Sequence, residues 1–193
     1  VIEHPEMKLL VENRLNAEKI NMNKPAVCVV IVNYRSSVLV CNCLDSLIPE
    51  IIDIGCVIVV DNCSGDSSLD VISSHVSEKH WGGICKVVSS EFNGGFSYGN
   101  NFGVNYALAL SISPDYFLLL NPDTIVRKNS ILSLVDFLRR NPEVGIAGSR
   151  LENIDGGLEA SAHVFPSPIG ELEGGARLGI LSKILTRYVV TPP

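Results

Sequence analysis

The sequence has few positive charges and no long apolar run. Lys and Arg total 15 against 21 Asp and Glu, which gives the 193 residues a formal net charge of −6. A protein that binds nucleic acid over a broad surface presents a basic face, so we expect no nucleic-acid partner. A membrane-spanning helix needs about 18 or more consecutive apolar residues. No stretch approaches that length, so we expect no transmembrane segment.

The chain also lacks the paired cysteines that are typical of a zinc site. Its 6 cysteines include no C-x-x-C pair, which argues against zinc ligation. Residues 1–10 carry Glu3, Glu6 and Lys8, which do not suit the apolar segment of a signal peptide. We therefore expect reduced thiols and a cytoplasmic protein, with peripheral association of the full-length protein at the inner membrane face left open.

Two familiar phosphate-binding motifs are missing. The segment Asn93-Gly94-Gly95-Phe96 resembles a phosphate loop. It matches neither the dinucleotide motif G-x-G-x-x-G nor the P-loop G-x-x-x-x-G-K-[ST]. Its glycines would still let backbone approach a ligand closely.

The sequence does contain a regular alternation of short apolar runs and helical patterns. Hydrophobic residues make up 46% of the chain, enough for a substantial core. We expect strands at 26–32, 56–60, 84–89, 116–120 and 144–151. We expect helices at about 37–48, 67–79, 97–111 and 130–141, the last capped by Asn129 or Ser130. This order predicts a doubly wound α/β fold with a mostly parallel sheet and helices on both faces.

Some expectations concern single elements. Residues 6–20 have the pattern of an amphipathic helix, and Asp155-Gly156-Gly157 suits a hairpin turn after which 158–164 pairs back. On the helix after the first strand, a set of apolar residues should face the core: Val38, Leu39, Cys41, Leu44 and Leu47.

The run at 116–120 ends abruptly at Asn121-Pro122-Asp123. Such an apolar run suits a strand buried on both faces. A carboxylate at its end would lie in the crevice where open α/β sheets bind ligands. We interpret Asp123 as a ligand for a divalent metal that holds the diphosphate of a nucleotide. The alternative is a plain turn in which Asp123 or Thr124 caps the next helix.

Loops after the other strands carry groups that suit a nucleotide. Asn33-Tyr34-Arg35 offers backbone groups, an aromatic face and a cation, and Asp61 offers a carboxylate for a base or ribose. Asn100 and Asn101 are unfavourable inside a helix, which suggests that they face something polar. The alternatives are a solvated Arg35, a capping Asp61 and solvent-facing asparagines.

Taken in order, these segments resemble the nucleotide-sugar half of family 2 glycosyltransferases of GT-A fold, and most of all the bacterial rhamnosyltransferase-like branch. The segments are 30–34 (VIVNY), 59–66 (VVDNCSGD), 93–103 (NGGFSYGNNFG) and 118–123 (LLLNPD). The match spans roughly residues 26–167. It implies a helical extension at 1–25, a nucleotide-sugar-binding domain at 26–167 and the start of an acceptor-side region at 168–193.

The resemblance implies roles for particular residues. Asp123 would be the metal-binding carboxylate of a D-x-D motif, with Mg²⁺ or Mn²⁺ as cofactor, and Asn121 replaces the first Asp of that motif. Asn can ligate through its carbonyl oxygen but brings no charge. The residues implied to bind the nucleotide sugar are Asn33, Tyr34, Arg35, Asp61, Asn93, Gly95, Phe96, Asn101 and Asn121.

The chemistry implied is inverting transfer of a sugar from a nucleoside diphosphate donor to a hydroxyl of a saccharide or lipid-linked acceptor, in cell-surface polysaccharide or glycolipid synthesis. The family's catalytic base matches no acidic residue of this chain, so we expect it beyond Pro193, and expect this piece to bind donor without full transferase activity. Two alternatives stay open: a nucleotide-sugar-binding module without turnover, and a sugar nucleotidyltransferase. The second would show a basic, Gly-rich loop after the first strand, where this chain has 33–37 (NYRSS).

Overall fold

A computed structural model of the chain describes residues 27–50, 54–110, 113–153 and 155–159. They belong to two compact units, Val1–Asn141 and Pro142–Pro193, which we describe separately. The helix expected at 6–20 and the segment from 160 onward lie outside the described residues. No described helix has the length and apolar character needed to cross a bilayer.

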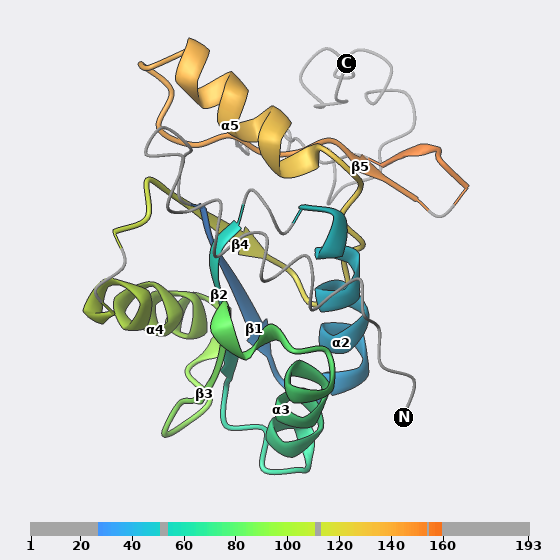
Figure 1. Cartoon of the computed structure of the whole chain (residues 1–193), viewed down its shortest axis with the longest axis vertical. Helices are drawn as coiled ribbons and strands as arrows, with labels where there is room; N and C mark the ends of the chain where they lie inside the picture. The colour runs from blue at the N-terminus through green and yellow to red at the C-terminus, as the bar shows by residue number, and fades with distance from the viewer. Residues whose placement is uncertain (1–26, 51–53, 111–112, 154, 160–193) are drawn as a thin grey trace, which may run out of the picture. The chain divides into compact units, whose positions relative to one another are not determined.

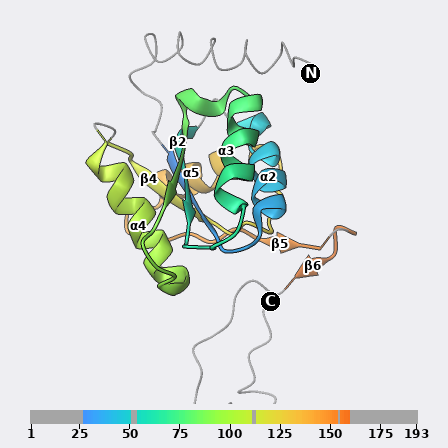
Figure 2. The ribbon, with the colours of Figure 1, turned by 90° about the horizontal axis from the view of Figure 1, so that it is seen from below.

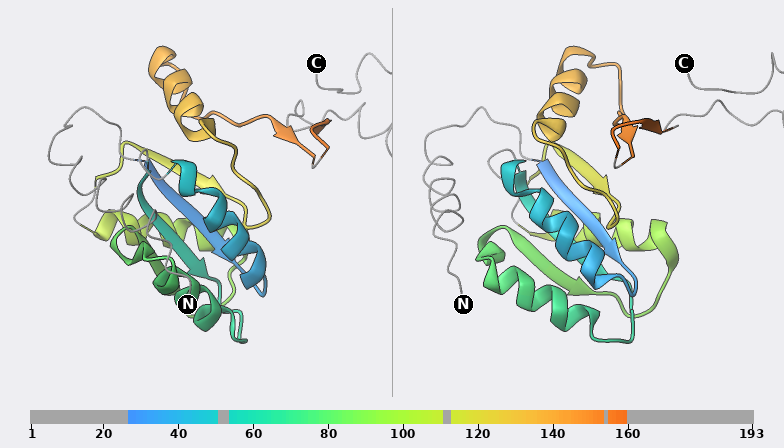
Figure 3. Two further views of the ribbon diagram at one scale, coloured as in Figure 1. Left: turned by 45° about the vertical axis from the view of Figure 1, so that its right-hand side comes forward. Right: turned by 90° about the vertical axis from the view of Figure 1, so that its right-hand side faces the viewer.

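The first unit is built on a four-stranded parallel sheet of order β3-β2-β1-β4. The strands are β1 (Val27–Asn33), β2 (Ile54–Asp61), β3 (Cys85–Ser89) and β4 (Tyr116–Leu120). Their arrowheads point the same way in Figure 3. Every residue of β1 is buried, as expected for a β-branched run between two neighbouring strands and two helical layers.

Helices cover both faces of this sheet (Figures 1 and 2). Helices α2 (Ser37–Ser46), α3 (Ser68–Glu78) and α5 (Ser130–Arg140) pack on one face, over Val29, Ile31 and their neighbours. Helix α4 (Gly95–Ala109) packs on the other face, over Val30 and Val60. Short 3₁₀ turns follow α2 and α3: η1 (Ile48–Glu50) and η2 (Trp81–Gly83). The doubly wound α/β fold is thus confirmed.

Helix α4 lies close to the sheet because two of its inward positions are glycines. A Cβ on Gly99 would stand 2.6 Å from Val32 Cγ1, and a Cβ on Gly103 would stand 2.5 Å from Val30 Cγ1. Neither distance leaves room for a methyl group. The short distance between helix and sheet on this face therefore depends on glycine, which has no side chain, at both positions.

The inward face of α2 differs from the one expected. Val38 and Leu39 are exposed by 68% and 45%, whereas Val40, Cys43, Leu44 and Leu47 are buried. The buried set has the i, i+3, i+4, i+7 spacing of one helix face, and Val38 and Leu39 lie off that face. The sequence pattern allowed both phases, because apolar residues occupy nearly every position from 38 to 44.

Two strand expectations were wrong. Strand β4 is not buried on both faces: Leu119 is 50% exposed, because in the described sheet β4 has β1 as its only neighbour. The run at 144–151 is not a fifth strand of the described sheet. In the second unit, β5 (Leu151–Glu152) pairs antiparallel with β6 (Leu158–Glu159) across the expected turn at Asp155-Gly156-Gly157.

The tight contact of α4 gives a direct test of this packing. We expect Gly103→Ala to lower the free energy of unfolding by about 1–3 kcal/mol, because the new methyl group overlaps Val30. Gly82→Ala is the control, since no atom lies within 4 Å of a Cβ placed there. Urea denaturation of both variants measures the difference, and equal stabilities would contradict the packing described.

Candidate nucleotide-sugar site

The carboxyl ends of the parallel strands place the candidate residues at one end of the sheet. Asn33 of β1 is paired in register with Asp61 of β2, which is paired with Ser89 of β3. The chain runs from β1 to β2 to β3 and then crosses to the other side of β1 to form β4. The strand order therefore reverses between β1 and β4, and this reversal is where doubly wound sheets bind ligands.

A buried polar cluster joins the loops after β1 and β2. Asn33 Nδ2 donates to Asp61 Oδ1 at 2.7 Å and to Ser64 Oγ at 3.1 Å. Ser64 Oγ donates to Asp61 Oδ1 at 2.5 Å, and Ser64 N donates to Asp61 Oδ2 at 3.1 Å. A carboxylate has about four acceptor positions, and these bonds use three of them. Asp61 therefore orders the loops, and these bonds leave one of its acceptor positions unused.

The Asp61 carboxylate is 4% exposed, and the bonds from Asn33 and Ser64 are what make its burial tolerable. These bonds also settle one alternative. Helix α3 begins at Ser68 with Ser67 as its N-cap residue, and Asp66 Oδ1 accepts the hydrogen bond from Ser68 N. Hydrogen bonds from Ser68 hold the pKa of Asp66 below its ordinary value. The carboxylate at the start of α3 is thus Asp66 and not Asp61.

Tyr34 and Arg35 are exposed, but contacts with Tyr34 and Ser64 fix the position of Arg35. The Arg35 guanidinium carbon lies 5.1 Å from the centroid of the Tyr34 ring, a cation–π distance. Arg35 N donates to Ser64 Oγ and Arg35 Nε donates to Ser64 O, each at 3.0 Å. Arg35 and Cys63 both have a φ of 55°, which is uncommon for residues other than glycine. Arg35 is therefore a tethered cation, not a freely solvated one.

The loop after β3 joins the cluster through Asn62, a motif residue to which the sequence analysis assigned no role. Asn62 Nδ2 donates to Asn93 Oδ1 at 2.9 Å and to Gly95 O at 3.1 Å, and Ser90 Oγ donates to Asn62 Oδ1 at 3.1 Å. Asn62 is 1% exposed. Asn62 and Ser64 lie within the motif at 59–66, and Ser90 lies in no motif, but only their burial and hydrogen bonds show that they build the cluster.

Gly95 is required at its position because of its backbone conformation. Its φ is +82°, and no atom lies within 4 Å of a Cβ built there. Glycine adopts this conformation without steric cost, whereas other residues are strained. The space beside Gly95 is open, so backbone is accessible to a ligand there.

The polar residues expected on α4 separate into two kinds. Asn100 is buried and its Nδ2 donates to Phe96 O at 3.0 Å, within its own helix. Asn101 is exposed, and so is Phe96, by 57%. Asn100 is thus a structural residue, and Phe96 and Asn101 are accessible to a ligand.

The same segment, Gly95-Phe96-Ser97-Tyr98-Gly99, has the G-x-S-x-G spacing of a nucleophile elbow. An elbow places its serine on a sharp turn directly between a strand and a helix. Here β3 ends at Ser89 and Ser97 lies inside the first turn of α4. This spacing therefore has no hydrolase role in this fold.

Asp123 lies in a β-turn directly after β4. Thr124 N donates to Asn121 O at 3.2 Å and Thr124 Oγ1 donates to the same oxygen at 2.5 Å. Pro122 occupies the second turn position, which its fixed φ favours. Asn121 and Asp123 are exposed, and among the described residues neither side chain has a hydrogen-bond partner.

The capping alternative for Asp123 and Thr124 does not hold. Helix α5 has Asn129 at its N-cap position, as expected, but the side chain of Asn129 makes no capping bond. The Glu50 carboxylate caps the helix instead, accepting from the backbone N–H groups of Asn129 and Ile131. Asp123 therefore does not cap α5.

None of the 6 cysteines is in a disulfide, and most are buried. Burial raises the pKa of Cys43 to about 11 and that of Cys85 to about 12. These thiols keep their protons near neutral pH. Cys43 Sγ donates to Asn121 O at 3.7 Å, which places it beside the turn that carries Asp123.

The family of the chain follows from comparison with known proteins. The family model described as "Glycosyl transferase family 2" matches residues 28–187. This chain belongs to glycosyltransferase family 2. The match covers the sheet, the loops of the polar cluster and the turn at Asp123.

Relatives in this family include a low-salt glycan biosynthesis hexosyltransferase of Haloferax volcanii, 31% identical over 144 residues. A glycosyltransferase of Haemophilus influenzae without an assigned reaction is 27% identical over 133 residues. The aligned parts cover 75% and 68% of this chain but 41% and 38% of the relatives. The chain thus spans about two-fifths of the length of these relatives.

A solved structure supports the fold of this family 2 chain. The mannosyltransferase of Pyrobaculum calidifontis, in complex with GDP-Man and Mn²⁺, matches with a TM-score of 0.55 and 15% identity. The match covers 75% of this chain and 43% of that one. The likeness confirms the GT-A type of α/β fold.

The polar cluster of the site gives a stability prediction. We expect Ser64→Ala to lower the free energy of unfolding by about 1–3 kcal/mol, because the buried side chains of Asn33 and Asp61 each lose a hydrogen bond to the Ser64 hydroxyl. Ser73→Ala, exposed on α3, should change it by less than about 0.5 kcal/mol. Chemical denaturation with matched m-values measures both, and a Ser64→Ala value equal to the control would contradict the cluster.

Proposed function

We propose that this chain is the donor-binding part of an inverting glycosyltransferase, which binds a nucleoside diphosphate sugar together with Mg²⁺ or Mn²⁺. The observation that carries the proposal is the position of Asp123, an exposed carboxylate in a turn at the carboxyl end of β4. It lies on one side of the strand-order reversal, and the ordered loops after β1, β2 and β3 lie on the other.

The loops of the first three strands fit the nucleoside part of the donor. Asp61 retains an acceptor position for a base N–H or a ribose hydroxyl. Tyr34 and Arg35 offer a ring face and a tethered cation. Because hydrogen bonds within the protein already hold these loops, little conformational entropy would be lost when a ligand binds.

The donor set fits a metal that is shared with a diphosphate. No group of three or more His, Cys, Asp or Glu side chains that could hold a metal occurs in the part of the chain that the structure describes. Mg²⁺ is commonly held by one or two carboxylates plus substrate phosphates and water. Asp123, with the side-chain carbonyl oxygen of Asn121 as a neutral second ligand, meets that need. When bound, the metal would offset charge that develops on the leaving diphosphate.

Further parts of the proposal concern the reaction. Asn93, Gly95, Phe96 and Asn101 would face the diphosphate and the donor sugar, since their loop is accessible and is joined to the Asp61 cluster by Asn62. The acceptor would be a hydroxyl of a saccharide or lipid-linked sugar at the inner face of the membrane, which the resemblance to the rhamnosyltransferase-like branch implies. The hexosyltransferase relative, named for glycan biosynthesis, supports this class of product.

Thermal and isothermal titration with UDP, dTDP and GDP, each with and without Mn²⁺, tests the proposal. At a hundredfold excess over Kd, a ligand that binds only the folded chain stabilises it by about 2.7 kcal/mol. We expect at least one nucleotide to stabilise the chain more strongly with Mn²⁺. We expect Asp123→Ala to abolish this metal-dependent part and to leave unliganded stability within about 0.5 kcal/mol, because the side chain is exposed.

Glu78→Ala is the matched control, since it removes one exposed carboxylate at the last turn of α3. It should retain the metal dependence. Retention of metal dependence in Asp123→Ala would remove Asp123 as the ligand. Unfolding of that variant would instead assign the residue a structural role in the turn.

A further inference from the structure

The segment that carries Asp123 is fastened to α2 and η1, which precede it by some 80 residues. After its turn, this segment runs back alongside α2 toward α5 (Figures 1 and 3). Val126 N donates to Ser46 Oγ at 2.9 Å, and Ile131 N donates to Glu50 Oε2 at 3.2 Å. Both contacts join residues that stand 80 and 81 positions apart in the chain.

Glu50 is a buried carboxylate whose acceptor positions point at this segment. Its side chain is 1% exposed, and its two oxygens accept from the N–H groups of Asn129 and Ile131 at the start of α5. A helix N-terminus favours a negative charge. Burial of a carboxylate is costly unless hydrogen bonds compensate it, so these contacts hold the segment at a defined place.

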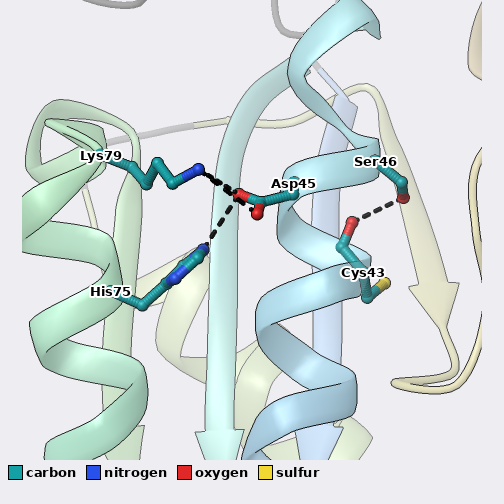
Figure 4. A network of polar contacts seen from close by, with 5 residues as sticks. All are labelled: Cys43, Asp45, Ser46, His75 and Lys79. Atoms are coloured by element: carbon teal, nitrogen blue, oxygen red, sulfur yellow. Dashed lines mark hydrogen bonds and ion pairs between the residues drawn. The ribbon is translucent and has the colours of Figure 1, made fainter. Parts of the chain in front are cut away.

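Ser46, the last residue of α2, also bonds to this segment. Its hydroxyl donates to Cys43 O at 2.6 Å within the helix, which leaves a lone pair to accept from Val126 N. Figure 4 shows Asp45 and Ser46 on opposite sides of α2: Asp45 points to His75 of α3 and to Lys79, the C-cap residue of that helix, and Ser46 points away from them. Neighbouring residues of one helix thus serve different contacts.

We propose that Ser46 and Glu50 are positioning residues, which set where the turn of Asn121 and Asp123 stands relative to the loops after β1 and β2. Neither residue lies in the candidate site. The inference rests on the proposed role of Asp123 as a metal ligand. Since α2 begins directly after the Asn33–Arg35 loop, one helix connects the nucleoside side of the site to its metal side.

The test compares Ser46→Ala, Glu50→Gln and Asp45→Ala in the full chain. Mn²⁺ is titrated in the presence of saturating GDP, UDP or dTDP, whichever binds the wild-type chain. We expect Ser46→Ala and Glu50→Gln to raise the apparent Kd for Mn²⁺ by about tenfold, as loss of outer support for a metal ligand does. Affinity for the nucleotide without metal should not change. Asp45→Ala removes the contacts with His75 and Lys79, which lie on the other side of α2, and should leave both constants at wild-type values.

Equal Mn²⁺ constants in Ser46→Ala and Asp45→Ala would overturn the positioning role. So would a Ser46→Ala variant that loses metal-free nucleotide affinity as strongly as metal affinity, because that pattern indicates general damage. If Glu50→Gln fails to fold, Ser46→Ala alone decides, since its hydroxyl is only partly buried.

Hydrogen exchange separates this inference from the proposed function. Amides in 121–131 should exchange faster in Ser46→Ala than in Asp45→Ala, and equal exchange would overturn the fastening. A wild-type chain without any metal response overturns the proposed function and the positioning role together. A wild-type response with unchanged variants overturns the positioning role alone.

Discussion

The register of Asn33 against Asp61 is the constraint on which the site depends. Parallel pairing of β1 and β2 brings the last residues of both strands side by side. Since both side chains are buried there, each needs a polar partner, and each supplies it to the other. Ser64 and Ser36 bond to this pair, and Arg35 bonds to Ser64, so hydrogen bonds join the loops after both strands.

The two halves of the site are held by different means. The proposed nucleoside side is a hydrogen-bonded network among the loops after β1, β2 and β3, with Asn62 as its link to the third loop. On the proposed metal side, the turn and the segment after it bond to α2, and the end of that segment bonds to Glu50 of η1. The carboxylate at each side has a different setting: Asp61 is buried and engaged, and Asp123 is exposed. This contrast suits one carboxylate that orders loops and one that meets a cation.

Much of the first unit follows from local patterns. Strand β4 begins and ends where its apolar run does, and β1, β2 and β3 differ from expectation by a few residues at their ends. The family motifs place Asp123 after β4, and the structure places it in the expected turn. Single-residue patterns could not separate Asn100 from Asn101, because both are asparagines in one helix, and only packing shows that Asn100 is buried.

By itself, the sequence determined the strand–helix alternation, the parallel sheet and the family, because periodicity, β-branched runs and ordered motifs are local properties. Only the tertiary structure decided the inward face of α2 and the exposed side of β4, since these depend on which elements are neighbours. It also showed that the run at 144–151 is not a fifth strand of the described sheet. It also decided that Glu50, and not a residue of the turn, caps α5. A hydrogen bond between residues 81 positions apart leaves no trace in a local pattern.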